Sequence, residues 1–518
     1  MKSQTLSLIA VTTALAAVTG FAVLAEPDGP APAPAAASAK APRLPVERTM
    51  LACPAPSTSD LAETAYTAYT PAGGAGAAEG KDGDAAKGAA ELVPTTTAEA
   101  GAEGDDPAAE VDLKPVKPLL TMNGPGRPVV AERSGAETPA ATGIADGRLA
   151  PGWTAQQTTT VAAGDTRGVL GARCTAPGSD FWFPGASTAD NRSDYVHLVN
   201  PDDTAAVADV ELYGKNGRLK APSGEVGQAV KVPARGSVPL LLSTLTDETV
   251  DDVTVHVGTR VGRVSAAVQA TDDKAPGADW LQAGGDPAAR LVLPGIPADA
   301  TNVRLYAFTP DGDDAELKVE LAGKSGSFTP AGHESVYVKG GMTASVDLGD
   351  VTRGEAGSLV LTPTRGDTPV VAALRVTRGK GADQEFAFVS ASDPVGARAT
   401  ATDNRAKGST LSLVAPRKGE SVRVKVTASA GSGGGEPASK TFTVKGGTTT
   451  AVVPPVPEGL KGRYALTLEP EDGSGPVYAA RTLSLPEDGI PMFTVQTLSD
   501  DRGSVAVPEA GQDLSVLD

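Results

Sequence analysis

The sequence predicts an all-β protein that is built from tandem Ig-like β-sandwich repeats. Three observations predict this fold: many turn residues, short segments in which apolar and polar residues alternate, and an internal repeat. The 518 residues include 60 glycines and 42 prolines, but only 9 Phe, 3 Trp and 8 Tyr. Such a composition favours turn-rich β structure with small side chains over a helical bundle.

The internal repeat consists of three windows of equal length, at residues 195–270, 303–378 and 410–485. Each window contains about six segments with period-two alternation, and turn residues separate these segments. This is close to the strand count of a β-sandwich. Each window is therefore predicted to form most of one sandwich.

A related opening strand precedes each window, and a fourth copy begins at Met492 with too few residues after it for another repeat. The N-terminal region contains the late part of a repeat, GRPVVAERS, but no opening strand. We therefore expect the C-terminal strand to complete the divergent N-terminal unit, so that the array closes and leaves no frayed sheet edges.

These patterns divide the chain into seven segments. Their predicted boundaries are 1–25 for a signal peptide or N-terminal membrane anchor, 26–50 for a Pro/Ala-rich spacer, 51–179 for a divergent N-terminal β unit, 180–278, 279–384 and 385–491 for three β-sandwich repeats, and 492–518 for a closing strand and tail. Residues 73–110 combine small and acidic residues with few large apolar side chains, so we expect a disordered acidic insertion there.

The N-terminus predicts export. Residues 5–24 are uncharged, follow Lys2, and are long enough to cross a bilayer as a helix. Val23-Leu24-Ala25 also offers small residues where signal peptidase cleaves. The segment is therefore either a membrane anchor or a cleaved signal, which places the protein at the extracellular face of the cytoplasmic membrane or outside the cell. Membrane contact is expected only through residues 5–24, if they are not cleaved.

The chain has two cysteines, Cys53 and Cys174. In an exported protein the simplest interpretation is one disulfide between them, which closes a long loop. We expect it to join the N-terminal region to the repeats.

No catalytic, cofactor-binding or metal-binding residues are predicted. The three histidines, His197, His256 and His333, lie in different strand patterns, and no Gly-x-Ser-x-Gly elbow is followed by a histidine. The formal net charge of −18 disfavours binding to nucleic acid.

An aromatic strand is the one candidate contact surface. Phe181 and Phe183 lie on one face of this strand and Trp182 lies on the other, because side chains alternate along a strand. One face must belong to the core. The opposite face is either a partner or glycan surface or a packing surface between units.

Several motifs resemble a known family. They are RCTAPGSDFWFPG, VNPDDTAAVADVELYGKNG, GADWL, LVLPGIP and PVVAERS. In this order they are similar to an actinobacterial family of exported, membrane-proximal proteins defined as a domain of unknown function. The resemblance extends from about Cys53 to the C-terminus. It implies export and a β-repeat architecture, and it brings no activity, cofactor or site residues.

The sequence therefore predicts a non-enzymatic, exported scaffold or binding module of the cell envelope. Its expected partner is an envelope protein or a polysaccharide, and no cofactor is expected. The alternative is an accessory or degenerate carbohydrate-active enzyme or a polysaccharide-binding protein. Paired carboxylates or a histidine that converge in a polar cleft would favour that alternative. The sequence does not determine the oligomeric state.

Overall fold

The computed structural model describes residues 42–73, 88–98, 116–222, 227–431 and 434–507. This part of the chain contains many antiparallel strands, three short 3-10 turns and no α-helix. The predicted all-β repeat fold is confirmed. The predicted signal or anchor segment lies outside the described residues.

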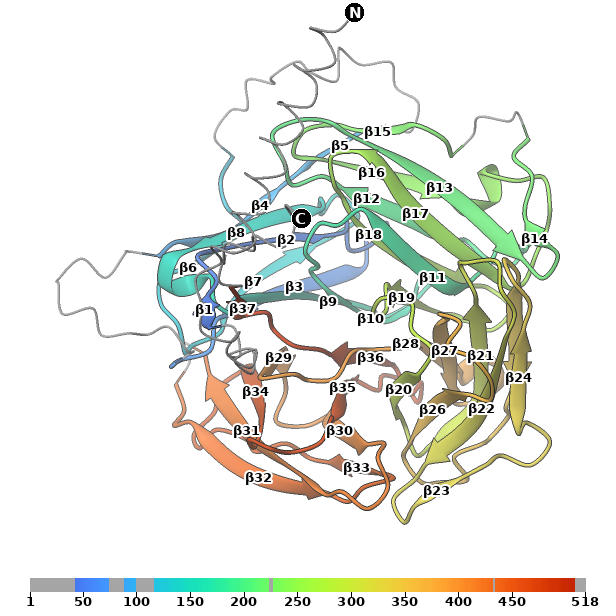
Figure 1. Cartoon of the computed structure of the whole chain (residues 1–518). Helices are drawn as coiled ribbons and strands as arrows, with labels where there is room; N and C mark the ends of the chain where they lie inside the picture. Colours follow the sequence, from blue (N-terminus) through green and yellow to red (C-terminus); the bar gives the residue numbers. More distant parts are fainter. Residues whose placement is uncertain (1–41, 74–87, 99–115, 223–226, 432–433, 508–518) are drawn as a thin grey trace, which may run out of the picture. The chain divides into compact units, whose positions relative to one another are not determined.

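Residues 45–505 form one compact unit. It contains four β-sandwiches, which we number 1 to 4 along the chain, and each consists of two mostly antiparallel sheets (Figure 1). Two further short strands, β1 (Arg43–Pro45) and β37 (Ser504–Ala506), form a two-stranded sheet.

Sandwich 1 pairs the sheet β10-β9-β3-β7 with the sheet β2-β8-β4-β6. Its strands are β2 (Arg48–Cys53), β3 (Ala62–Tyr69), β4 (Ala90–Pro94), β6 (Leu120–Met122), β7 (Val129–Ser134), β8 (Ala141–Asp146), β9 (Thr154–Val161) and β10 (Gly168–Arg173).

Sandwich 2 pairs the sheet β11-β17-β13-β14, with β15 also on β13, with the sheet β19-β18-β12-β16-β5. Its strands are β5 (Thr96–Thr97), β11 (Asp180–Ala186), β12 (Tyr195–Val199), β13 (Ala206–Gly214), β14 (Gly217–Arg218), β15 (Val230–Val232), β16 (Gly236–Leu241), β17 (Val253–Val261), β18 (Ser265–Asp272) and β19 (Gly277–Gln282).

Sandwich 3 pairs the sheet β20-β26-β22-β23, with β24 also on β22, with the sheet β25-β21-β27-β28. Its strands are β20 (Leu291–Ile296), β21 (Ala300–Phe308), β22 (Ala315–Ala322), β23 (Ser327–Phe328), β24 (Ser335–Val338), β25 (Thr343–Asp347), β26 (Gly357–Pro363), β27 (Val371–Arg378) and β28 (Glu385–Ser390).

Sandwich 4 pairs the sheet β29-β34-β31-β32 with the sheet β33-β30-β35-β36. Its strands are β29 (Ala399–Asn404), β30 (Ser409–Ala415), β31 (Val422–Ala430), β32 (Ala438–Val444), β33 (Thr448–Val452), β34 (Tyr464–Pro470), β35 (Tyr478–Ser484) and β36 (Phe493–Leu498).

Each sandwich has its own apolar core between its two sheets. The alternation that predicted the strands also fills these cores. In β13, for example, Ala206, Ala208, Val210 and Leu212 are buried, whereas the residues between them are more exposed. Successive side chains of a strand point to opposite faces, so a period of two places every second residue in the core.

The four sandwiches meet around one centre. The strands β10, β19, β28 and β36, one from each sandwich, contact one another in this cyclic order, and β36 contacts β10 again (Figure 1). The last sandwich therefore packs against the first, and the array is closed. Near this closure the Val46 N–H donates to the Gly503 carbonyl over 3.2 Å.

The way in which the array closes differs from the prediction. The strand that begins after Met492, β36, pairs with β35 and so completes sandwich 4, not the N-terminal unit. Sandwich 1 has its own central strand, β10, in the Gly-containing sequence GVLGAR. The strands predicted to open the second and third repeats are likewise the last strands, β19 and β28, of the sandwiches that precede them. Alternation identifies a strand, but it does not identify the neighbour with which that strand pairs.

The predicted disordered insertion at 73–110 is also wrong in part. Residues 90–94 form β4, with Ala90 and Leu92 fully buried in the core of sandwich 1. Residues 96–97 form β5, which pairs in parallel with β16 of sandwich 2. The flanking acidic residues lie outside the described residues. A single apolar pair, Leu92 and Val93, was too short a signal to predict a strand within such a polar segment.

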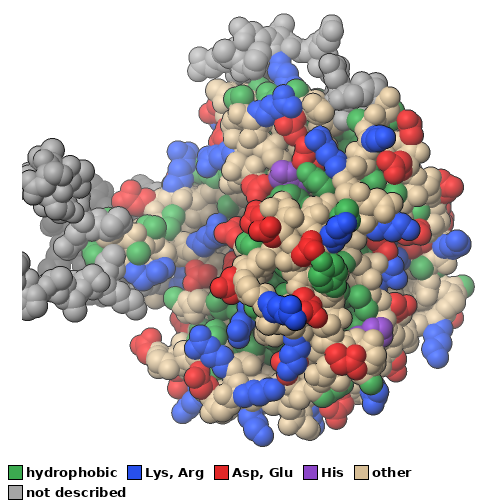
Figure 2. All heavy atoms as spheres, turned by 45° about the vertical axis from the view of Figure 1, so that its right-hand side comes forward, with side chains coloured by type: hydrophobic (Ala, Val, Ile, Leu, Met, Phe, Trp, Pro, Cys, Tyr) green, Lys and Arg blue, Asp and Glu red, His purple; other side chains and the backbone are tan. Residues whose placement is uncertain are grey.

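The predicted spacer at 26–50 ends in ordered structure, since β2 begins at Arg48. On the face shown in Figure 2, acidic and basic side chains are interspersed over the surface. The acidic residues that give the chain its formal net charge of −18 do not gather in one patch on that face.

Candidate functional site

A buried carboxyl group lies where the four central strands meet. Asp279 Oδ1 of β19 accepts hydrogen bonds from the Gly171 N–H of β10, at 3.3 Å, and from the Thr494 hydroxyl of β36, at 3.1 Å. Its Oδ2 accepts from the Phe388 N–H of β28, at 3.2 Å. One side chain therefore bonds to the other three sandwiches. Burial raises the pKa of Asp279 to about 8, so its carboxyl group is mostly neutral at pH 7.

A second buried acid lies nearby. Burial, and after it the Asp279 carboxyl group, raise the pKa of Glu385 to about 9. Glycines line its carboxyl group: a Cβ at Gly277 would lie 2.5 Å from Glu385 Oε1, and a Cβ at Gly168 would lie 3.1 Å from it. This neutral acid pair is a structural centre without access for a substrate. In the sequence, the feature that could have indicated this pair is an acidic residue in each of two largely apolar strands, Asp279 in β19 and Glu385 in β28.

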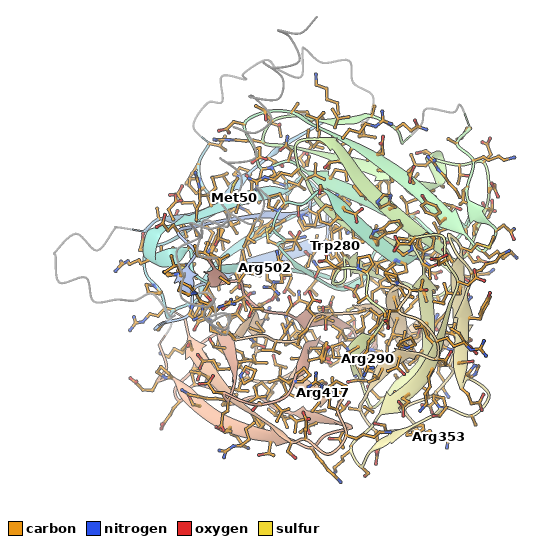
Figure 3. The ribbon with its side chains drawn as sticks, in the orientation of Figure 1. Met50, Trp280, Arg290, Arg353, Arg417 and Arg502 are labelled. Carbon is orange, nitrogen blue, oxygen red and sulfur yellow. A yellow bond between two sulfur atoms is a disulfide. The ribbon has the colours of Figure 1, made fainter. Side chains whose placement is uncertain are left out.

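The next residue along β19, Trp280, shows how closely sandwiches 1 and 2 meet beside this centre (Figure 3). Its side chain is buried in a cluster with Val161 and Leu170 of sandwich 1 and Ala267 of sandwich 2. Large apolar side chains therefore pack at this junction, beside polar contacts such as the hydrogen bond from the Gln282 amide to the Arg173 carbonyl at 2.8 Å.

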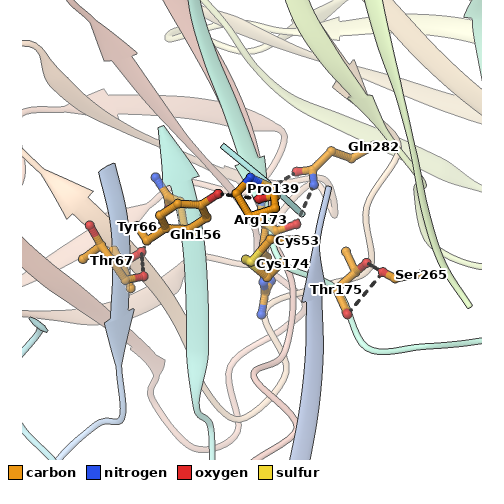
Figure 4. Close-up of a disulfide and its surroundings, with 11 residues drawn as sticks. Cys53, Tyr66, Thr67, Pro139, Gln156, Arg173, Cys174, Thr175, Ser265 and Gln282 are labelled. Carbon is orange, nitrogen blue, oxygen red and sulfur yellow. Dashed lines mark hydrogen bonds between the residues drawn. A yellow bond between two sulfur atoms is a disulfide. The ribbon is translucent and has the colours of Figure 1, made fainter. Parts of the chain in front are cut away.

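The predicted disulfide between Cys53 and Cys174 is confirmed (Figure 4). Both cysteines are buried in the core of sandwich 1. Cys53 ends β2 in one sheet and Cys174 follows β10 in the other, so the bond joins the two sheets of sandwich 1. The expectation that it joins the N-terminal region to the repeats is wrong, because the end of β10 belongs to sandwich 1.

The predicted aromatic surface is divided between a core and a junction. Phe183 is fully buried in the core of sandwich 2, and Phe181 packs against the same core. Trp182 lies on the other face, as predicted. Its ring stacks on the His256 ring, with 3.9 Å between the ring centroids, and on the Phe308 ring of sandwich 3, with 5.1 Å between the ring centroids. Phe183 therefore cannot contribute to a surface, and Trp182 packs between sandwiches 2 and 3.

A polar cluster surrounds the imidazole that stacks on Trp182. His256 Nε2 lies 2.6 Å from Asp180 Oδ1, and His256 Nδ1 lies 3.3 Å from Glu211 Oε2. The Tyr213 hydroxyl donates to Glu211 at 2.7 Å, and burial together with this carboxylate raises the pKa of Tyr213 to about 12. Both imidazole nitrogens are thus engaged by carboxylates. The histidine pattern in the sequence did not show this convergence, because β11, β13 and β17 come together only in the sheet.

Among the described residues, no group of three or more His, Cys, Asp or Glu side chains is arranged to hold a metal ion. Within the same part of the chain, no helix has the length and apolar character needed to span a membrane.

A groove of about 590 Å³ lies between sandwiches 1 and 4, where the array closes. Basic residues of sandwich 4 and one edge of sandwich 1 line it. The lining residues are Pro128, Val130 and Glu132 from sandwich 1, and Arg405, Gly431, Lys461, Gly462 and Arg463 from sandwich 4.

A buried carboxylate positions the two arginines of this groove. Asp403 is fully buried, and its backbone has a φ of 51°. Its Oδ1 lies 2.9 Å from Arg405 Nε and 2.9 Å from Arg463 Nε, and its Oδ2 accepts from Arg405 Nη2 at 3.2 Å. Arg463 Nη2 also lies 3.0 Å from Glu132 Oε1 of sandwich 1. The Arg463 guanidinium therefore bridges the two sandwiches.

The junction beneath the groove is polar. The Tyr69 hydroxyl of sandwich 1 bonds to the Ser429 hydroxyl at 3.1 Å and to the Thr467 hydroxyl at 3.2 Å, both in sandwich 4. The Thr402 hydroxyl donates to Gln156 Oε1 at 3.2 Å. The other junctions contain large apolar side chains. They are Trp280 between sandwiches 1 and 2, Phe386 and Phe388 between 2 and 3, and Phe493 and Val495 between 3 and 4.

The protein is therefore a modular all-β protein, in which four sandwiches close around a buried pair of acids. Its candidate surface site lies at the junction between two of these modules. The chain belongs to a family of unknown function, DUF5719, which matches residues 129–455. The match begins in β7 and ends after β33, so it contains sandwich 3, sandwich 2 apart from β5, and parts of sandwiches 1 and 4. It confirms membership of an unknown-function family over a shorter range than the sequence motifs indicated. No curated protein matches the chain.

Proposed function

We propose that this protein is a non-enzymatic, exported scaffold or binding module of the cell envelope, which presents four joined β-sandwiches to an envelope protein or polysaccharide. The observation that carries the proposal is the groove between sandwiches 1 and 4. Its walls come from the first and the last sandwich, so the groove exists only while the array is closed. Binding sites commonly lie at such junctions between modules.

Export is supported by the disulfide together with the N-terminal sequence. A buried disulfide such as Cys53–Cys174 forms and persists in an oxidising compartment. Residues 5–24 are an uncharged segment behind a basic residue, as in an export signal or anchor.

A binding role is better supported than hydrolysis. Glycoside hydrolysis uses two carboxyl groups on either side of the scissile bond. The groove is lined by one carboxylate, Glu132, which already contacts Arg463. The Asp279 and Glu385 carboxyl groups are buried at the centre, where a saccharide cannot reach them. Among the two alternatives to a scaffold, the groove therefore favours a polysaccharide-binding protein over a degenerate enzyme.

The test uses the chain from residue 26 onward, which keeps every described residue. The immobilised protein is incubated separately with detergent-solubilised envelope proteins and with envelope polysaccharide, and a Lys461→Gln/Arg405→Gln variant serves as the comparison. We expect the wild type to retain material from one fraction and the variant to retain less of it. Equal retention by both proteins would refute the role of the groove. Release of new reducing ends from the polysaccharide would refute a non-enzymatic role.

A further inference from the structure

Basic side chains outnumber acidic ones in the lining of the groove, although the molecule as a whole is acidic. The chain carries a formal net charge of −18, but the groove is lined by Arg405, Lys461 and Arg463 and by one acid, Glu132. Arg405 and Arg463 are paired with Asp403 and Glu132, whereas Lys461 makes no ion pair with any described residue. All three basic residues line a hollow between two modules.

The two guanidinium groups are held in place from behind. The buried Asp403 carboxylate accepts hydrogen bonds from Arg405 Nε and Nη2, and it forms an ion pair with Arg463 Nε at 2.9 Å. Its position is fixed in turn by the next residue, because the Asn404 amide donates to the Ala401 carbonyl at 2.8 Å and to the Tyr464 carbonyl at 3.2 Å. Groups that are held in this way lose little freedom when a ligand binds.

Donors remain for a ligand after these contacts are made. Within the described residues, Nη1 of Arg405 and Nη1 of Arg463 have no hydrogen-bond partner, and Lys461 makes no ion pair. The side chains of Arg405 and Arg463 are 27% and 17% exposed, so a ligand in the groove can reach both. Guanidinium and ammonium groups in such a setting bind carboxylate or phosphate oxygens.

The other lining residues restrict the kind of ligand. The apolar side chains in the groove are Pro128 and Val130, and no aromatic ring lines it. A neutral sugar would find no ring on which to stack, and a peptide would find no deep apolar pocket for an anchor residue. Gly431 and Gly462 leave backbone exposed, and a Cβ at Gly462 would meet no atom within 4 Å.

From this arrangement, and building on the binding function proposed above, we infer that the groove binds an anionic saccharide, whose carboxylate or phosphate groups contact Arg405, Lys461 and Arg463. The volume of about 590 Å³ is within the range of small-ligand sites, roughly 300 to 1,000 Å³. An open groove of this kind accommodates one or a few sugar units of a longer chain.

The experiment is isothermal titration calorimetry on the chain from residue 26 onward, at low ionic strength. Three probes separate the chemistries: hexagalacturonic acid carries carboxylates, glucose 6-phosphate carries a phosphate, and maltohexaose is neutral. We expect at least one anionic probe to bind, with an affinity that falls as salt is added, and we expect no binding of maltohexaose. Whichever anionic probe binds identifies the oxyanion that is recognised.

Exposed residues of the groove allow variants that leave the fold intact. Val130 is 41% exposed and lines the groove. Val130→Glu should weaken the affinity for the anionic probe by about three- to fivefold, whereas Val130→Gln should not change it. Lys461→Gln should weaken it by about three- to tenfold. Lys407→Gln is the matched control, because Lys407 is exposed on a nearby turn and does not line the groove.

The outcomes separate this inference from the proposed function. If neither anionic probe binds, or if Val130→Glu and Lys461→Gln bind as the wild type does, the inference is wrong. Retention of an envelope fraction by the wild type in the same preparation would then leave the scaffold proposal standing. Loss of both kinds of binding would overturn both proposals. An equal effect of Lys407→Gln would show that the affinity depends on total charge and would also refute the groove.

Discussion

The buried Asp279 carboxyl group predicts a specific dependence of stability on pH. Its pKa is about 8 in the folded protein, because burial disfavours the charged form, whereas an exposed aspartate has a pKa of about 3.9. Between pH 4 and pH 8 the folded state therefore keeps a proton that the unfolded state has released. The contribution of Asp279 to the free energy of unfolding should therefore fall as the pH rises through this window and should level off above pH 8.

The magnitude follows from the difference between the two pKa values. About four units at about 1.4 kcal/mol each amount to roughly 5 kcal/mol of stability lost between pH 4 and pH 8. Asp279→Asn removes the titrating group. It also places an amide N–H₂ opposite the Phe388 N–H, which now donates to Asp279 Oδ2, and this should cost about 1 to 2 kcal/mol at every pH.

The variant should therefore be no more stable than the wild type near pH 5 and clearly more stable near pH 8. We expect the difference in unfolding free energy, variant minus wild type, to rise by about 1.4 kcal/mol per pH unit between pH 5 and pH 8. Urea unfolding followed by tryptophan fluorescence measures it, since Trp280 is buried beside the centre. Asp311→Asn, at an exposed turn, is the control. A difference that does not change with pH would refute the reasoning.

Three other predictions concern the sandwiches themselves. Cys53→Ala/Cys174→Ala should lower the stability of sandwich 1 by up to about 5 kcal/mol, because the disulfide closes a loop of 121 residues. In the wild type, labelling of the thiols should require a reductant, and labelling without one would contradict the disulfide. Gly277→Ala should lower the melting temperature far more than Gly312→Ala. Both glycines have a positive φ, but only a Cβ at position 277 would press against the buried Glu385 carboxyl group. Equal decreases in melting temperature would contradict the close packing of Gly277 on Glu385. Trp182→Ala should destabilise the junction of sandwiches 2 and 3 by about 3 kcal/mol without changing binding in the groove, and a change in binding there would contradict the assigned role.

Local patterns in the sequence predicted the strands but not their neighbours. The alternation in Phe181-Trp182-Phe183 placed Phe183 and Trp182 on opposite faces, as observed, and the structure showed that the Phe183 face belongs to the core. The same alternation could not show that β36 pairs with β35, because a period of two is satisfied equally well in any sheet.

The candidate site was hidden from the sequence for a related reason. Glu132 and Arg463 line one groove and lie 3.0 Å apart, yet more than 300 residues separate them along the chain. Neither residue belongs to a motif, and each is an ordinary charged residue of a strand or turn. Their role depends on the contact between the first and the last sandwich.

The sequence by itself determined the all-β class, the repeat and the pairing of Cys53 with Cys174. These properties follow from composition, from a period along one strand, and from there being two cysteines in the chain. The tertiary structure decided that Asp279 bonds to three other sandwiches and that Asp403 holds two arginines at a groove. Such contacts join residues that are far apart in the chain, and only the packing of whole sandwiches brings them together.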